Sequence, residues 1–271
     1  MHLDNLLSRN SRIVNSKRKS YIDPWAKDVY TKEELNELEI NQNFAKEVAR
    51  YHDYYQWKNF KLPINSFANQ IFLNKYGIDL LKHNNTIKET IIDVGAFIGD
   101  TAMVFRDEFP DNKIICFEPE EKNYNLCLET LKLNNAQNIV VEKLGLGDKK
   151  CTSYIDGTGG TAKIKVHGEQ QVNITTLDDY VKENNIKVGL IKVDIEGFEK
   201  NFIEGAKETL RTQAPTLLLS IYHSTDDFFT IKPMVEEIMK DSPFEYRYDF
   251  FEPVSQYSIF ETLLICEKKL Q

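Results

Sequence analysis

Acidic residues and a histidine follow directly after four apolar, strand-like runs of this sequence. These residues are Asp93, Glu118, Asp194 with Glu196, and His223. In an open parallel sheet, ligands bind beyond the carboxyl ends of the strands, near the point where the strand order reverses. We therefore expect these side chains to meet in one site.

The segment from Ile91 to Thr101 is typical of a strand, a tight glycine turn and a helix. Glycines accept positive φ there, and the helix N-terminus presents free N–H groups to a ligand. The spacing is Asp-x-Gly-x-x-x-Gly, which differs from the Gly-x-Gly-x-x-Gly of dinucleotide-binding turns. Asp93 and Asp100 would repel a pyrophosphate, so a cationic sulfonium with an α-amino group fits this turn better than NAD.

Glu118 ends the second strand-like run, where an acid is placed to accept both hydroxyls of a ribose. This position predicts a bound nucleoside, whereas a solvated acid at a strand end is the simpler alternative. Thr101 has two readings as well, because it could contact the ligand or merely cap the helix after the turn.

From residue 89 onward, strands alternate with helices, which predicts parallel βαβ units with right-handed crossovers. Pro110 ends the first of these helices, and a later one begins with Thr175 or Thr176 as its cap. Between residues 151 and 172, glycine turn signals predict a hairpin insertion. The seven expected strands lie near residues 90–94, 113–118, 138–141, 189–194, 215–222, 246–250 and 261–266.

Residues 1–89 have helical patterning and aromatic clusters but no alternation of strands and helices. We predict a helical extension, with one helix capped by Thr31 and a second that runs from about Phe67 to Gly77. Its aromatic side chains either pack in the core or cover one rim of a substrate pocket.

The composition favours a globular α/β protein and argues against nucleic acid as a partner. The 271 residues include 41% hydrophobic ones, with a net charge of −8 and a pI near 5.3. The four cysteines form no Cys-x-x-Cys pair, and no apolar run is long enough to span a membrane. We expect a soluble, cytoplasmic protein that has neither a disulfide framework nor a zinc site.

Four stretches together resemble the FkbM-type S-adenosylmethionine-dependent methyltransferases. The most specific is Lys-x-Asp-x-Glu-Gly-x-Glu at 192–199, and the others lie at 93–101, 117–119 and 175–178. The resemblance covers residues from about 90 to 266 and divides the chain into an extension, 1–89, and a methyltransferase domain, 90–271. It implies a Rossmann-like class I methyltransferase fold with a seven-stranded, mostly parallel sheet and helices on both faces. It also implies S-adenosylmethionine as cofactor and O-methylation of hydroxyls.

The resemblance assigns cofactor contacts residue by residue. It gives the glycine turn to the methionine part, Glu118 to the ribose, and the exit of the third strand to the adenine. The residues so assigned are Asp93, Gly95, Ala96, Phe97, Gly99, Asp100, Thr101, Glu118, Pro119, Gly145, Asp148 and Asp194.

Methyl transfer from a sulfonium is an in-line displacement, so the enzyme aligns the acceptor oxygen and removes its proton. His223 has the residue type and the strand-end position for this base, and Asp194 and Glu196 compete for the role. The simpler alternative for His223 is a structural histidine that makes hydrogen bonds at the rim of the site. Asp194 and Glu196 could also hold Mg²⁺, but the turn at Gly197 and an interaction with Lys192 would give them a structural role, and we expect no metal.

The sequence therefore predicts a methyltransferase that acts on a hydroxyl of a sugar, glycan precursor or related small metabolite. Two rival hypotheses are a nicotinamide-dependent dehydrogenase on a similar sheet and a non-catalytic nucleoside-binding module. The missing Gly-x-Gly-x-x-Gly argues against the first. The acceptor and the oligomeric state are not predicted.

Overall fold

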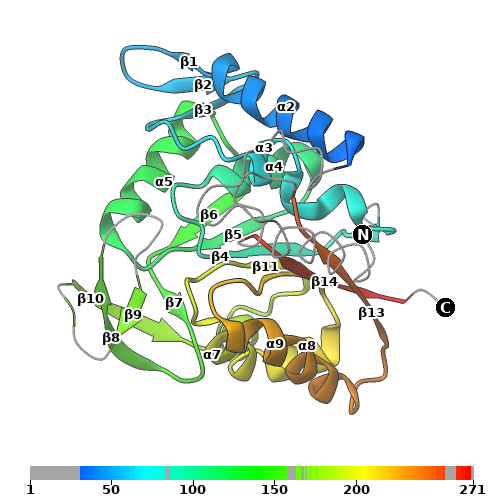
Figure 1. The fold of residues 1–271 in the computed structure, drawn as a ribbon. Helices are drawn as coiled ribbons and strands as arrows, with labels where there is room; N and C mark the ends of the chain where they lie inside the picture. The colour runs from blue at the N-terminus through cyan, green and yellow to red at the C-terminus, as the bar shows by residue number, and fades with distance from the viewer. Residues whose placement is uncertain are drawn as a thin grey trace.

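The computed structural model describes residues 31–83, 86–157, 163–165, 168, 170–253 and 261–269. Its centre is a seven-stranded sheet in the order β13-β14-β12-β11-β4-β5-β6 (Figure 1). The predicted Rossmann-like architecture is confirmed. The strands of this sheet are β4 (Thr90–Val94), β5 (Ile114–Phe117), β6 (Ile139–Glu142), β11 (Val188–Val193), β12 (Thr216–Ser220), β13 (Tyr246–Phe251) and β14 (Leu263–Lys268).

The strand order places the predicted residues at one edge of the sheet. Strands β6, β5, β4, β11 and β12 are parallel neighbours, whereas β14 pairs antiparallel with both β12 and β13. The chain passes from β4 to β5 on one side and returns to β11 on the other side of β4. The order thus reverses between β4 and β11, which is where an open sheet of this kind forms a crevice.

Helices cover both faces of the sheet (Figure 1). One face is packed by α4 (Asp100–Glu108) and α5 (Glu121–Leu133), the other by α6 (Leu177–Glu183), α7 (Glu199–Glu204), α8 (Lys207–Gln213) and α9 (Thr225–Met239). Between β11 and β12 the chain forms two short helices, α7 and α8, because the helical path breaks at Gly205. A Cβ on Gly205 would lie 1.9 Å from the carbonyl oxygen of Gly147, so backbone packing sets this break.

The predicted hairpin insertion forms part of a second sheet beside the main one. Its four strands run in the order β7-β10-β8-β9, with β10 antiparallel to β8 and parallel to β7. Residues 158–162 of the expected glycine loop lie outside the described residues. The bounds are β7 (Gly145–Leu146), β8 (Cys151–Asp156), β9 (Lys163–Lys165) and β10 (Gln170–Thr175).

The N-terminal extension is not purely helical, in contrast to the prediction. Helix α2 (Lys32–Glu47) begins as expected, because the Thr31 side chain accepts the N–H of Glu34 in a capping box. A small antiparallel sheet follows, with β1 (Ala49–Arg50), β2 (Tyr55–Trp57) and β3 (Phe60–Leu62). Aromatic residues favour such strands, and alternate side chains point into the core.

The second predicted helix of the extension is also wrong. The chain forms α3 (Asn69–Phe72) and then the short 3₁₀ segment η1 (Lys75–Leu80), inside which Tyr76 and Gly77 have φ values of 52° and 81°. A Cβ on Gly77 would lie 3.2 Å from Ile265 of β14. The helical path is therefore interrupted where the extension packs against the main sheet.

The extension shares a hydrophobic core with the main sheet. Trp57 and Tyr76 belong to the same buried cluster as Ile91 of β4, Phe105 of α4 and Leu263 of β14. The described part of the extension, from residue 31 onward, therefore belongs to the structural unit that carries the site. In the part of the chain that the structure describes, no helix is long and apolar enough to cross a membrane.

Replacement of Trp57 tests this shared core. The Trp57 side chain is 4% exposed and its ring centroid lies 4.8 Å from that of Phe44. We expect Trp57→Ala to lower the free energy of unfolding by about 3–5 kcal/mol in urea denaturation followed by circular dichroism. The control Tyr51→Ala removes an aromatic ring that is 48% exposed and should change it by about 0.5 kcal/mol or less. A main transition that keeps its wild-type midpoint in Trp57→Ala would contradict the shared core.

Candidate active site

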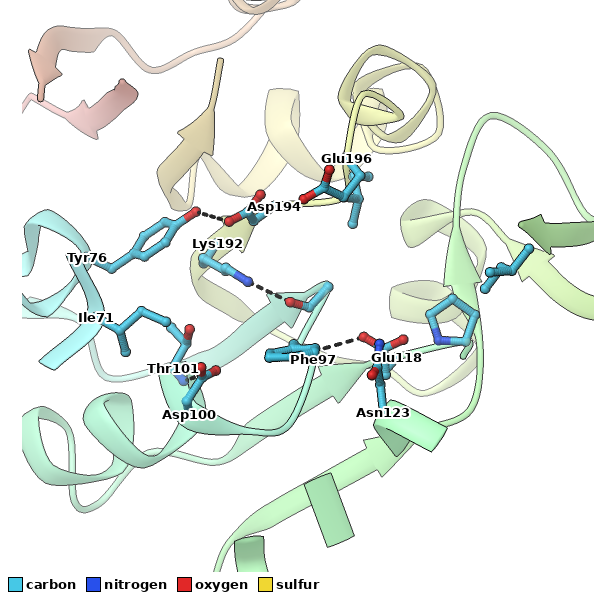
Figure 2. Close-up of a pocket in the computed structure, with 14 residues that line it drawn as sticks. Ile71, Tyr76, Phe97, Asp100, Thr101, Glu118, Asn123, Lys192, Asp194 and Glu196 are labelled. Atoms are coloured by element: carbon cyan, nitrogen blue, oxygen red, sulfur yellow. Dashed lines mark hydrogen bonds between the residues drawn. The ribbon is translucent and has the colours of Figure 1, made fainter. Parts of the chain in front are cut away.

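A cavity opens at the carboxyl ends of β4, β5 and β11, where the sequence places its acids (Figure 2). Helices α3, α4 and α5, segment η1 and strand β8 complete its wall. Seven of the twelve predicted cofactor residues, together with Glu196, thus share one cavity with residues that were not predicted. The lining residues are Ile71, Tyr76, Gly95, Phe97, Asp100, Thr101, Glu118, Pro119, Asn123, Ile155, Lys192, Asp194, Ile195 and Glu196.

The glycine turn after β4 is shaped by the neighbouring strand end. Gly95 has a φ of 77°, and a Cβ at this position would lie 1.9 Å from the carbonyl oxygen of Asp194. Only glycine fits, because both the backbone angle and the space exclude a side chain. Gly99, with a φ of 80°, is the N-cap of α4, so Thr101 lies inside the helix and is not its cap.

Asp100 lies at the N-terminus of α4 and faces the cavity. Its Oδ1 accepts the backbone N–H of Thr101 at 2.9 Å, and its side chain is almost completely buried. Burial raises the pKa of Asp100 to about 7, although Lys192 opposes the shift. The start of the helix thus presents an acid and free N–H groups to a ligand.

Glu118 follows β5 and connects the glycine turn to the next helix. Its Oε2 accepts the N–H of Phe97 at 2.9 Å, and its Oε1 accepts the N–H of Glu120 at 3.0 Å (Figure 2). Burial raises the pKa of Glu118 to about 7 against these two hydrogen bonds. The Asn123 side chain also donates to Glu118. A carboxylate has about four lone-pair positions, so about one stays open to a ligand hydroxyl, and a second hydroxyl would take the place of the Asn123 hydrogen bond.

Asp93 does not line the cavity, although it was predicted as a cofactor residue. It is completely buried, and its Oδ1 lies 3.1 Å from Nζ of Lys192, which also donates to the carbonyl oxygen of Gly95 at 2.7 Å. Asp93 therefore supports the turn through Lys192, whose hydrogen bond to the turn is drawn in Figure 2. The expected interaction of Lys192 with a glutamate of its own motif is replaced by this pair with Asp93.

Beside the cavity, His223 lies among three carboxylates. Its Nε2 is 3.2 Å from Oδ1 of Asp194 and 3.6 Å from Oε1 of Glu196, and its Nδ1 is 2.9 Å from Oε1 of Glu199. The hydroxyls of Tyr76 and Tyr222 donate to Asp194 from the other side, at 3.1 and 3.4 Å to Oδ2. Two strand ends, η1 and the start of α7 thus converge on one polar cluster.

This environment argues against His223 as a free general base. Burial would lower the pKa of His223, but the contacts with Asp194, Glu196 and Glu199 outweigh it and raise the pKa to about 12. The side chain is 5% exposed, and His223 does not line the cavity. Of the three base candidates, Asp194 and Glu196 face the cavity, whereas His223 lies behind them.

Four other predicted cofactor residues lie outside the cavity wall. Ala96 is buried beneath the turn, and Gly99 caps α4. Gly145 pairs with Ile174 in the second sheet, and Asp148 contacts Asn201 and Lys149. Gly145 and Asp148 thus do not line this cavity, and their contact with an adenine stays a prediction.

The sequence analysis did not identify Ile71, Tyr76, Asn123, Ile155 or Lys192 as residues of the site. Tyr76 lies 118 positions before Asp194, its hydrogen-bond partner, and only the packing of η1 against the sheet brings the two together. Ile155 comes from the hairpin insertion, which the sequence shows only as turn signals. Lys192 stands inside the most specific motif and could have been recognised as a buried cation that needs an acidic partner.

Comparison with known proteins assigns the chain to a family. Residues 93–250 match the family model described as the methyltransferase FkbM domain. The chain belongs to the FkbM methyltransferase family. Methyltransferase 1 of Beauveria bassiana (strain ARSEF 2860) is 24% identical over 205 residues, covering 65% of this chain and 80% of its own. Methyltransferase sdnD of Sordaria araneosa is 23% identical over 197 residues, and this match covers 59% of this chain and 74% of that protein.

The solved structure of an FkbM methyltransferase from Methylobacillus flagellatus KT has the same fold. Its TM-score is 0.56 at 17% identity, and the match covers 86% of this chain. The chain spans only 60% of the length of that protein. The likeness supports the class I methyltransferase fold, whereas substrate and partners have to be argued from the site itself.

Removal of the Lys192 charge tests the supporting role of the Asp93–Lys192 pair. Lys192→Met leaves the Asp93 carboxylate buried without its cation, so we expect the free energy of unfolding to fall by about 3–5 kcal/mol. Urea denaturation measures the change, with Lys182→Met, an exposed lysine at the end of α6, as control. A Lys192→Met protein as stable as the control variant would show that the pair does not support the fold.

Proposed function

We propose that this FkbM family member is an S-adenosylmethionine-dependent O-methyltransferase acting on a hydroxyl of a sugar, glycan precursor or related small metabolite. The observation that carries the proposal is one cavity with a ribose-type acid, Glu118, and a second pair of acids, Asp194 and Glu196. The glycine turn lies between them. We assign the nucleoside to the Glu118 end of the cavity and the acceptor to the end with Asp194 and Glu196.

The residues of the cavity fit a cationic nucleoside. Glu118 would accept the ribose hydroxyls, and the turn at Gly95 with the N-terminus of α4 would hold the methionine part. Asp100 and Asp194 favour the sulfonium and the α-amino group by charge. The same acids would repel the pyrophosphate of a nicotinamide cofactor, which supports the methyltransferase over the dehydrogenase hypothesis.

When bound, S-adenosylmethionine supplies an activated methyl group on a sulfonium. The residues of this chain then have to align the acceptor oxygen with that group, exclude water and hold the leaving proton. Asp194 is the proposed proton acceptor, because its carboxylate faces the cavity and Tyr76 and Tyr222 fix its position. Glu196 would accept a hydrogen bond from a further hydroxyl, as a polyhydroxylated acceptor would provide.

Replacement of Glu118 tests the cofactor assignment. Hydrogen bonds to a charged group contribute about 1.5–3 kcal/mol, so Glu118→Gln should weaken binding of S-adenosylhomocysteine by about tenfold to a hundredfold at pH 8. Isothermal titration calorimetry measures the affinity. The control Glu129→Gln changes an exposed acid of α5, the helix that follows Glu118, and this variant should bind S-adenosylhomocysteine like wild type.

The pH dependence of cofactor affinity tests whether the negative charge of Glu118 contributes to binding. Because the pKa of Glu118 is raised to about 7, the carboxylate ionises as the pH rises through this value. Wild-type affinity should therefore fall about tenfold between pH 8 and pH 6. Asp100 titrates in the same range, so the contribution of Glu118 is the part of this decrease that Glu118→Gln lacks. Equal affinity and equal pH dependence in both proteins would refute the ribose assignment.

Methyl transfer itself distinguishes an enzyme from a nucleoside-binding module. With S-adenosylmethionine and a mixture of hydroxylated acceptors, we expect mass spectrometry to detect a methylated product. Asp194→Asn should lower kcat by about 10²–10⁴-fold, as expected for loss of a positioned base, while S-adenosylhomocysteine still binds. Asp107→Asn, an exposed acid on α4, serves as the control. Cofactor binding without methylated product would favour the binding module.

A further inference from the structure

The polar cluster behind the cavity has the composition of a metal site. We propose that Asp194, Glu196 and His223 bind one divalent first-row transition metal cation at the acceptor end of the cavity. Each residue offers one ligand atom, and these atoms all lie within 4.8 Å of one another. The cation site stands on its own geometry, and only its role toward an acceptor rests on the proposed function.

The spacing of the ligand atoms suits a single cation. Nε2 of His223 lies 3.2 Å from Oδ1 of Asp194 and 3.6 Å from Oε1 of Glu196. With bonds of about 2.1 Å, neighbouring ligands around one metal ion lie about 3.0–3.4 Å apart in octahedral or tetrahedral geometry. Two of the three distances therefore already suit one cation, and the third pair, the two carboxylate oxygens, lies within 4.8 Å and would close around the ion.

The His223 ring is a buried polar group directed into this cluster. Only 5% of its side chain is exposed. Neither ring nitrogen makes a well-aligned hydrogen bond within the described residues. Nε2 nevertheless points toward two carboxylate oxygens. A positive charge has to lie between these groups. In the absence of a metal the Nε2 proton supplies this charge, and a bound cation would replace that proton and take up the Nε2 lone pair.

A second layer of contacts already orients the proposed ligands. Glu199, which is completely buried, places Oε1 2.9 Å from Nδ1 of His223 and also accepts the N–H of Ile195. A carboxylate on the far nitrogen is the usual partner of a metal-binding histidine, because it fixes the ring and its tautomer. Tyr76 holds the other oxygen of Asp194 in the same way.

The ligand set indicates the kind of metal. Mg²⁺ and Ca²⁺ prefer oxygen ligands alone, whereas an imidazole with two carboxylates suits Mn²⁺, Fe²⁺ or Zn²⁺. Asp194 and Glu196 line the cavity, so the remaining coordination positions would face the acceptor. A cation there would orient an acceptor with neighbouring hydroxyls at these remaining positions.

Titration with Mn²⁺ alone, followed by electron paramagnetic resonance of the free ion, tests the site in the full chain. We expect one bound ion per wild-type chain. Glu196→Gln and His223→Ala should weaken binding at least about tenfold, and Glu199→Gln, which changes only the second layer, by about 10–100-fold. The control Glu204→Gln replaces an exposed acid at the end of α7 and should bind as wild type does.

The outcomes are decisive in both directions. Absence of Mn²⁺ binding by wild type, or equal binding by all variants, would overturn the proposal and leave His223 as an ion-pair partner. Thermal unfolding of each variant shows whether a loss of binding reflects a loss of the fold, and Glu196→Gln, on a partly exposed side chain, is the mildest change. A protein that binds Mn²⁺ but not S-adenosylhomocysteine would retain the cation site and refute the proposed function.

Discussion

The buried ion pair between Asp93 and Lys192 is the interaction on which the site depends. Both side chains are taken out of water at the ends of adjacent parallel strands, where an unpaired charge would be costly. The pair is compensated because Lys192 reaches across β4 and also donates to the carbonyl oxygen of Gly95. The cavity floor is therefore held by charge, while the turn above it stays open to a ligand.

The N-terminal extension matters to the site for the same electrostatic reason. Asp194 is a half-buried acid close to Glu196, and its carboxylate needs hydrogen-bond donors. Tyr76, from a segment before the family domain, supplies a hydroxyl to Asp194 and places its ring 5.5 Å from the ammonium group of Lys192. The Tyr76 side chain thus donates a hydrogen bond to Asp194 at the proposed acceptor end of the cavity. It also covers the ammonium group of Lys192 at the proposed cofactor end.

The sequence was sufficient to predict the residues of the cavity that stand at the ends of strands. The turn at Gly95, the acid at Glu118 and the pair Asp194 and Glu196 follow apolar strands, and parallel pairing brings such ends together. It was not sufficient where a contact depends on packing between distant segments, as for Tyr76. The role of His223 was equally hidden, because the residue type suggests a base and only the arrangement around it shows three carboxylates.

Asp194 links the two ends of the cavity through its backbone and its side chain. Its N–H donates to Val94 and its carbonyl oxygen leaves room only for glycine at position 95, so its main chain sets the shape of the cofactor turn. Its carboxylate faces the acceptor end, between the two tyrosine hydroxyls and His223. A shift of this one residue would move the glycine turn and the acids together. Under the proposed function, the pairing of β4 with β11 would therefore set the distance between methyl donor and acceptor.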